Sequence, residues 1–187
     1  MSRRRHLVAL PLALMVSALV ACTDVPRIPP PEPPASSEPL FASDEEALEA
    51  ATAAYEEYLA VSGAVTSQSE LSATGVEPFV TSDYLGEFDL ALDQLRENGL
   101  RTEGLSRLAR AELQQYFEDS AGVTIVIYVC LDVSGVRVLN EDGQDLTPPD
   151  RSTLVDLEIS LSSAPEEPEK LLLASSESWE AGAVCDR

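Results

Sequence analysis

Apolar positions recur at two different spacings along this chain, and the first of them is helical. The segment Ser43-Asp44-Glu45-Glu46 has a capping-box pattern, in which a serine is followed three residues later by a glutamate. Over residues 44–62 the apolar side chains then recur every three or four positions: Ala47, Leu48, Ala51, Tyr55, Tyr58 and Leu59. We expect one helix here. A second should be capped by Thr81 or Ser82 and end at Asn98-Gly99, because glycine is favoured just past a helix.

After Gly99 the apolar spacing changes to two, which is the period of a β-strand. Residues 124–133 form the clearest strand, with odd positions all apolar and even positions mixed, so one sheet face should seal a core and the other stay partly open. Further strands are expected at 155–161, 171–179, 100–109 and 111–117, although 108–117 also fits a helix. Helices followed by strands predict an α+β fold, with N-terminal helices packed on a curved, mostly antiparallel sheet.

The first 21 residues have the features of an export signal. Three arginines, Arg3 to Arg5, precede an uncharged apolar run from Leu7 to Ala21. This run is shorter than the roughly 20 residues that span a bilayer. A basic start, a short apolar middle and small residues at the end are typical of a secretory signal, with a short membrane anchor as the alternative. Residues 2–7 also partly resemble a twin-arginine motif, so the pattern leaves the export route open.

The four residues Leu19-Val20-Ala21-Cys22 resemble the bacterial lipobox. The resemblance implies that the Cys22 thiol receives a diacylglyceryl group and that Cys22 becomes the N-terminus. We therefore expect three parts: a signal peptide at 1–21, a lipid-anchored proline-rich linker at 22–40, and a single α+β extracytoplasmic domain at 41–187. The expected location is the outer face of the cytoplasmic membrane. Seven of the 13 prolines lie between Pro26 and Pro39, which favours an extended spacer.

The charge of the chain is strongly negative. The sequence has 12 Lys and Arg against 33 Asp and Glu, and residues 1–21 hold three of the basic residues and no acidic ones, which leaves 9 − 33 = −24 after their removal. A charge of this size argues against binding nucleic acid or anionic lipid by electrostatic attraction. We expect contact with the membrane only through the lipid on Cys22.

Few residues of the expected mature chain carry catalytic chemistry. The one histidine is His6, inside the signal, so a Ser-His-Asp or Cys-His site and histidine metal ligands are excluded after cleavage. The one lysine is Lys170, in an acidic loop. We expect no metal and no cofactor. With Cys22 reserved for lipid and an oxidising compartment expected, Cys130 and Cys185 are predicted to form a disulfide, two separate buried thiols being the alternative.

The order of elements over about 41–179 resembles the nuclear transport factor 2-like fold, which ketosteroid isomerases and SnoaL-like cyclases share. The segments "LQQYFEDSAG", "IYVCLDVSGVRVLNEDGQDLTPPDR" and "SSESW" also resemble a group of uncharacterised actinobacterial lipoproteins. The isomerase resemblance implies an acid in a cone-shaped pocket, for which Asp132, helped by Tyr128, is the candidate base. An aspartate at a strand end also caps turns, and we favour that interpretation.

These patterns favour one function and leave a second open. We expect a non-catalytic binding or scaffolding module at the cell surface, with a protein or a cell-wall component as its partner. The alternative is a small-molecule binder, or an isomerase-like or cyclase-like enzyme that uses a carboxylate in the pocket.

Overall fold

The computed structural model describes residues 39–120, 122–180 and 184–186. The predicted signal peptide, the predicted lipidation site Cys22 and nearly all of the proline-rich linker lie outside these residues. The described elements, in chain order, are α1 (Asp44–Thr66), a 3₁₀ turn η1 (Glu77–Phe79), α2 (Ser82–Glu97), β1 (Leu100–Glu103), β2 (Arg107–Asp119), β3 (Gly122–Asp132), β4 (Arg137–Asn140), β5 (Leu154–Ser163) and β6 (Leu171–Ser178).

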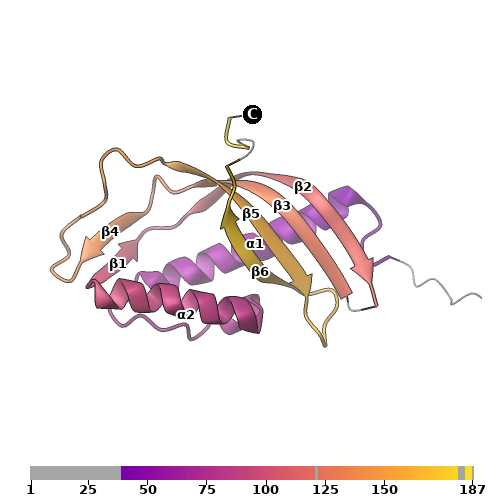
Figure 1. The fold of residues 1–187 in the computed structure, drawn as a ribbon, viewed down its shortest axis with the longest axis horizontal. Helices are drawn as coiled ribbons and strands as arrows, with labels where there is room; N and C mark the ends of the chain where they lie inside the picture. Colours follow the sequence, from indigo (N-terminus) through magenta and orange to yellow (C-terminus); the bar gives the residue numbers. More distant parts are fainter. Residues whose placement is uncertain (1–38, 121, 181–183, 187) are drawn as a thin grey trace, which may run out of the picture. The chain divides into compact units, whose positions relative to one another are not determined.

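The strands form two antiparallel sheets (Figure 1). The larger sheet has the order β2-β3-β5-β6, and β1 pairs with β4 in a separate two-stranded ribbon. Helix α1 runs beneath the four-stranded sheet, and α2 lies beside it below the ribbon (Figure 1). The predicted α+β architecture, with N-terminal helices on an antiparallel sheet, is therefore confirmed.

Both helices begin where the sequence predicts. The Ser43 side chain accepts a hydrogen bond from the Glu46 backbone N–H at 3.2 Å and caps α1. The Thr81 side chain likewise accepts from the Tyr84 backbone N–H and caps α2. Helix α2 ends before Gly99, whose φ of 61° suits glycine. Helix α1 continues four residues past the predicted end at 62, because Val65 is buried and adds a further contact to the apolar face.

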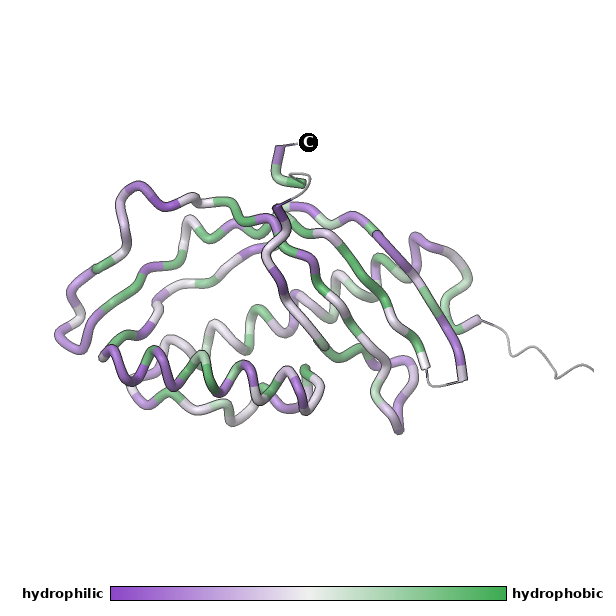
Figure 2. The backbone as a smooth tube through the Cα atoms, in the orientation of Figure 1, coloured by the Kyte–Doolittle hydropathy of each residue, from purple (hydrophilic) through white to green (hydrophobic). Residues whose placement is uncertain are grey.

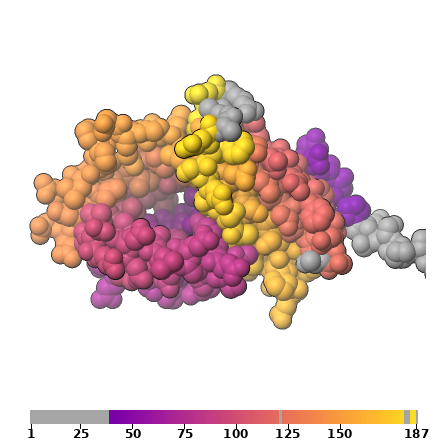
Figure 3. All heavy atoms as spheres, viewed as in Figure 1, coloured from indigo at the N-terminus to yellow at the C-terminus, as the bar shows by residue number. Residues whose placement is uncertain are grey.

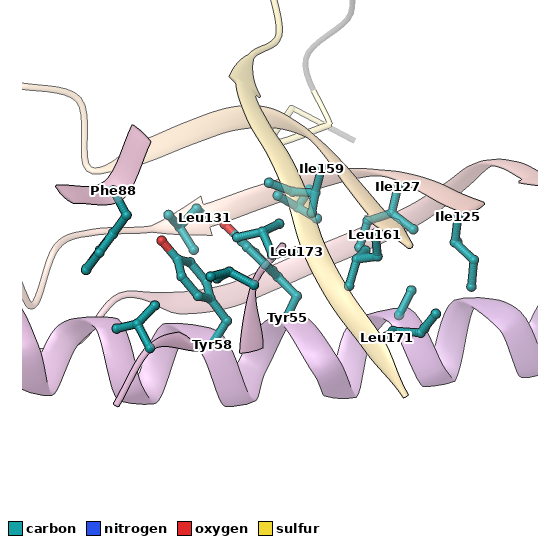
Figure 4. Close-up of a cluster of buried hydrophobic side chains, with 14 of the residues drawn as sticks. Tyr55, Tyr58, Phe88, Ile125, Ile127, Leu131, Ile159, Leu161, Leu171 and Leu173 are labelled. Carbon is teal, nitrogen blue, oxygen red and sulfur yellow. The ribbon is translucent and has the colours of Figure 1, made fainter. Parts of the chain in front are cut away.

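The core lies between α1 and the inward face of the large sheet. Ile125, Ile127 and Val129 of β3 are fully buried, as the alternating pattern predicts. Hydrophobic and hydrophilic residues alternate along the neighbouring strand β5 (Figure 2). Two small residues of α1, Ala47 and Ala51, are also fully buried and let the sheet approach the helix closely. Farther along α1, Tyr55 and Tyr58 rise towards the strands (Figure 4).

The predicted boundaries of the weaker strands were wrong. The pattern predicted that one strand would end and the next begin near Arg110. In the structure this boundary lies at Gly104, between β1 and β2. Gly104 has a φ of 99°, and a Cβ there would lie 2.0 Å from the Gly135 carbonyl oxygen. The helical alternative for 108–117 was also wrong, since β2 pairs along its length with β3. Strand β4 was not predicted, because four residues give too little alternation to recognise.

Candidate functional site

The outer face of the large sheet, on the side away from α1, carries the even-numbered residues of β3. Cys130 lies on this face and forms the predicted disulfide with Cys185, with a Cα–Cα distance of 4.9 Å. The Cys185 backbone N–H also donates a hydrogen bond to Asp156 Oδ1 at 2.9 Å. Val184 is fully buried. The segment 184–186 is therefore tied to the middle of the outer face.

Two aromatic rings stack next to this attachment. Tyr128 of β3 and Trp179, just after β6, have ring centroids 4.3 Å apart at an interplanar angle of 25°. The Trp179 backbone N–H donates to the Asp156 carbonyl oxygen, so Asp156 holds both Trp179 and Cys185. Desolvation raises the pKa of the Tyr128 hydroxyl, and the neighbouring Glu158 carboxylate adds to the effect. The result is a fixed aromatic platform on the outer face.

The candidate base Asp132 also lies on the outer face, at the end of β3, and it is half-buried. Its Oδ1 atom accepts a hydrogen bond from the Ser134 backbone N–H at 2.8 Å. Hydrogen bonds from the Ser134 side chain and backbone lower the pKa of Asp132. The positive charge of Arg107, which pairs with Asp132 from β2, lowers it further. A general base in a closed pocket needs the opposite shift. The structure thus gives Asp132 the turn-capping role and does not place it with Tyr128 inside a pocket.

The inward face holds a polar cluster that sequence reasoning missed. The Tyr58 and Tyr84 hydroxyl oxygens are 3.0 Å apart, and their rings meet edge to face. Burial raises the pKa of Tyr58 and of Tyr55, whereas hydrogen bonding with the Ser176 hydroxyl opposes the rise at Tyr55 and Tyr84. The sequence placed Tyr55 and Tyr58 on the apolar side of a helix, but it did not indicate that Ser176 would lie beside them.

Ser176 reaches the inward face because β6 changes register. Leu161 pairs with Leu173, but the next residue of β5, Ser160, pairs with Ser175. This irregularity adds one residue to β6 and turns Ser176 inward beside Ile159. A strict period of two from Leu171 and Leu173 would have turned Ser175 inward instead, so no sequence pattern revealed the cluster.

A hollow opens between α2 and the strands that face it (Figure 3). In the part of the chain that the structure describes, no group of three or more Cys, Asp or Glu side chains is arranged to hold a metal ion. None of the helices within that part has the length and apolar content required for a membrane span.

No family model matches this chain, and no curated protein matches it. Among solved structures, the chain is similar to the intermembrane-space region of the chloroplast protein ARC6, with a TM-score of 0.47 and 5% identity over 72% of this chain and 97% of that one. It is also similar to a de novo designed β-sheet protein, with a TM-score of 0.32 and 14% identity over 76% of this chain and 95% of that one. Similarities this low are no guide to function.

Proposed function

We propose that this chain is a lipid-anchored extracytoplasmic module that works by binding a protein with a basic surface. The observation that carries the proposal is the outer sheet face, where the disulfide, Asp156 and the Tyr128–Trp179 stack hold an aromatic platform in place. Rigid, partly exposed aromatic side chains are the residues that most often anchor protein interfaces. Membership of a lipoprotein group with a nuclear transport factor 2-like domain is part of the same proposal.

The charge around the platform indicates the kind of protein that would bind there. The outer-facing positions of the four strands include six carboxylates and two arginines: Glu112, Asp119, Asp132, Asp156, Glu158, Glu177, Arg107 and Arg110. Together with the strong net negative charge of the chain, this arrangement attracts basic proteins and repels anionic polymers. Association should slow at high salt, because ions screen charges that are far apart.

The location rests on two features of different kinds. A structural disulfide is typical of proteins outside the cytoplasm, and Cys130–Cys185 is one. The finer assignment, to the outer face of the cytoplasmic membrane, rests on the lipobox pattern that ends at Cys22. Metabolic labelling with a fatty-acid probe should tag the wild-type chain and not a Cys22→Ala variant. Equal labelling of the variant would show that Cys22 is not the lipid site.

Site-specific photo-crosslinking on intact cells tests the binding face. A photoreactive residue at Val126 or Ser160, on the outer face, should capture a basic protein, and the same residue at Asp89, exposed on α2, should not. Trp179→Ala should abolish capture from Val126. Capture from Asp89 alone, or capture that Trp179→Ala and added salt leave unchanged, would refute the outer face as the interface.

A second function, small-molecule binding on the inner side of the sheet, is supported by the partly buried hydroxyls of Tyr58 and Tyr84 and by the hollow beside α2 (Figure 3). Neutral tyrosine hydroxyls can donate hydrogen bonds to a ligand oxygen. This alternative no longer includes Asp132, whose carboxylate lies on the other face. Stabilisation of the wild type by a small molecule that does not stabilise Tyr84→Phe would favour it over protein binding.

A further inference from the structure

A separate cavity lies at the far end of the β1–β4 ribbon, away from the aromatic platform. Its volume is about 340 Å³, within the range of roughly 300–1,000 Å³ that is common for small-molecule sites. It is open to solvent on one side and is bordered by the loop after α1, the last turn of α2 and the ends of the two ribbon strands. The lining residues are Ser69, Leu71, Arg96, Gly99, Leu100, Arg101, Asn140 and Glu141.

Of the two arginines in the cavity, Arg96 is held by contacts within the protein, whereas most of the Arg101 hydrogen-bond donors are free to contact a ligand. Arg96 donates from Nε to the Leu71 carbonyl oxygen at 3.2 Å and forms an ion pair with Asp93. Among the described residues, the one carboxylate within ion-pair distance of Arg101 is that of Glu103, with an N–O distance of 3.9 Å, and the Arg101 side chain is 30% exposed. Glu103 is itself held by a closer ion pair with Arg137. The planar guanidinium of Arg101 therefore keeps most of its donors for a ligand.

Glu141 brings the opposite charge to the same cavity. Glu141 is the first residue after β4, and its side chain and that of Arg101 both line the cavity. The Glu141 carboxylate lies against Gly99, where an added Cβ would be 3.3 Å from its Oε1 atom. Among the described residues, no ion pair joins Arg101 to Glu141. The cavity thus presents a cation and an anion that are separated, with Leu71 and Leu100 supplying apolar surface.

We propose that this cavity binds a small zwitterion with an apolar body, of the class of a free α-amino acid. The Arg101 guanidinium donates two parallel hydrogen bonds to the ligand carboxylate, and the Glu141 carboxylate accepts from the ligand ammonium. Leu71 and Leu100 contact the apolar body. A ligand without net charge also escapes the long-range repulsion that this acidic chain exerts on anions. The site is independent of both the lipid anchor and the outer face.

Calorimetric titration of the full mature chain in detergent micelles tests the proposal with three probes: leucine, N-acetylleucine and leucinamide. Leucine should bind, and each blocked probe should bind at least about tenfold more weakly, because it loses one charge-assisted hydrogen bond. Arg101→Gln and Glu141→Gln should each weaken leucine binding to a similar extent. Lys170→Gln, in the exposed loop between β5 and β6, is the matched control and should leave the affinity unchanged.

A second readout separates loss of binding from loss of fold. Leucine should shift the NMR signal of the Gly99 amide, which lies in the cavity wall, and should leave that of Gly75, outside the lining, unchanged. The Gly75 signal should stay at its wild-type position in ligand-free Arg101→Gln. The proposal is overturned if leucine produces no heat and no Gly99 shift at millimolar concentration. It is overturned equally if N-acetylleucine or leucinamide binds as tightly as leucine, since a single charge would then suffice.

Discussion

At the scale of single residues, the position of a side chain on its strand decides its chemistry. Asp132 and Tyr128 occupy the outer register of β3, whereas Ile127 and Val129 alternate with them and fill the core. The alternation of β3 predicted this division. It could not show that Ser134 would turn back to donate to Asp132, because that contact depends on the path of the chain after the strand.

The lowered pKa of Asp132 predicts a stability effect that depends on pH. Its carboxylate is favoured in the folded state, so its contribution is present above the ordinary pKa of 3.8 and is lost as pH falls through the lower folded value. Asp132→Asn keeps an acceptor oxygen and loses the charge. The variant should therefore unfold at a slightly lower temperature than wild type at pH 7, with the difference disappearing near pH 2. Thermal denaturation at both pH values measures this.

Asp142→Asn, in the exposed turn after β4, is the control for that experiment and should match wild type at both pH values. A difference between Asp132→Asn and wild type that persists unchanged at pH 2 would contradict the account.

At the scale of elements, glycine and strand irregularities set boundaries that the apolar pattern does not show. Gly104 ends β1 because its positive φ and its contact with the Gly135 carbonyl leave no room for a side chain. The register change opposite Ser160 moves Ser176 inward. Both features depend on which segments meet in space. The sequence therefore predicted the two helices and the three clearest strands, but neither the β1–β2 boundary nor the tyrosine–serine cluster.

Gly104→Ala should destabilise the domain more than Gly75→Ala. The two glycines have nearly equal φ values, 99° and 97°, but a Cβ at Gly75 meets nothing within 4 Å. The backbone conformation alone should cost about 1–2 kcal/mol at either position. Gly104→Ala must also displace a backbone carbonyl, which should add about 1–3 kcal/mol. Urea denaturation of both variants measures the difference, and equal losses would show that the contact with Gly135 is unimportant.

The Cys130–Cys185 disulfide should contribute measurably to stability. It joins residues separated by 55 positions, and the chain-entropy account gives about 4 kcal/mol for a loop of that length. Replacing both cysteines with serine should lower the free energy of unfolding by a few kcal/mol. The intact mass of the wild type should be lower by two hydrogens than that of its reduced form. Free alkylation of Cys130 and Cys185 in the unreduced protein would contradict the bond.

At the scale of the whole molecule, the buried tyrosines make the stability of the fold depend on pH in the alkaline range. Burial raises the pKa of Tyr55 and Tyr58 above the ordinary value of 10.0, which favours their neutral forms in the folded state. The stability that they contribute is complete below pH 10 and falls as pH rises above it. Spectrophotometric titration should show these two tyrosines ionising only as the domain unfolds. Reversible ionisation of all five tyrosines with circular dichroism unchanged would contradict this prediction.

The net charge and the order of helices and strands could also be predicted from the sequence, because each depends on many residues together. The arginine cavity was not. It needs Arg96 from a helix, Arg101 from β1, Glu141 from the turn after β4 and Leu71 from a loop, and no local spacing brings these four together.

The disulfide also changes what a break in the backbone would do. Together with the chain from Cys130 to Cys185 it closes a covalent ring that contains β4, β5 and β6. The exposed loops 141–150 and 165–170 both lie inside this ring. A protease that cuts one of these loops linearises the ring but releases no fragment, so both new chain ends stay attached to the sheet. A single cut in these loops is therefore damage that the molecule can survive in one piece.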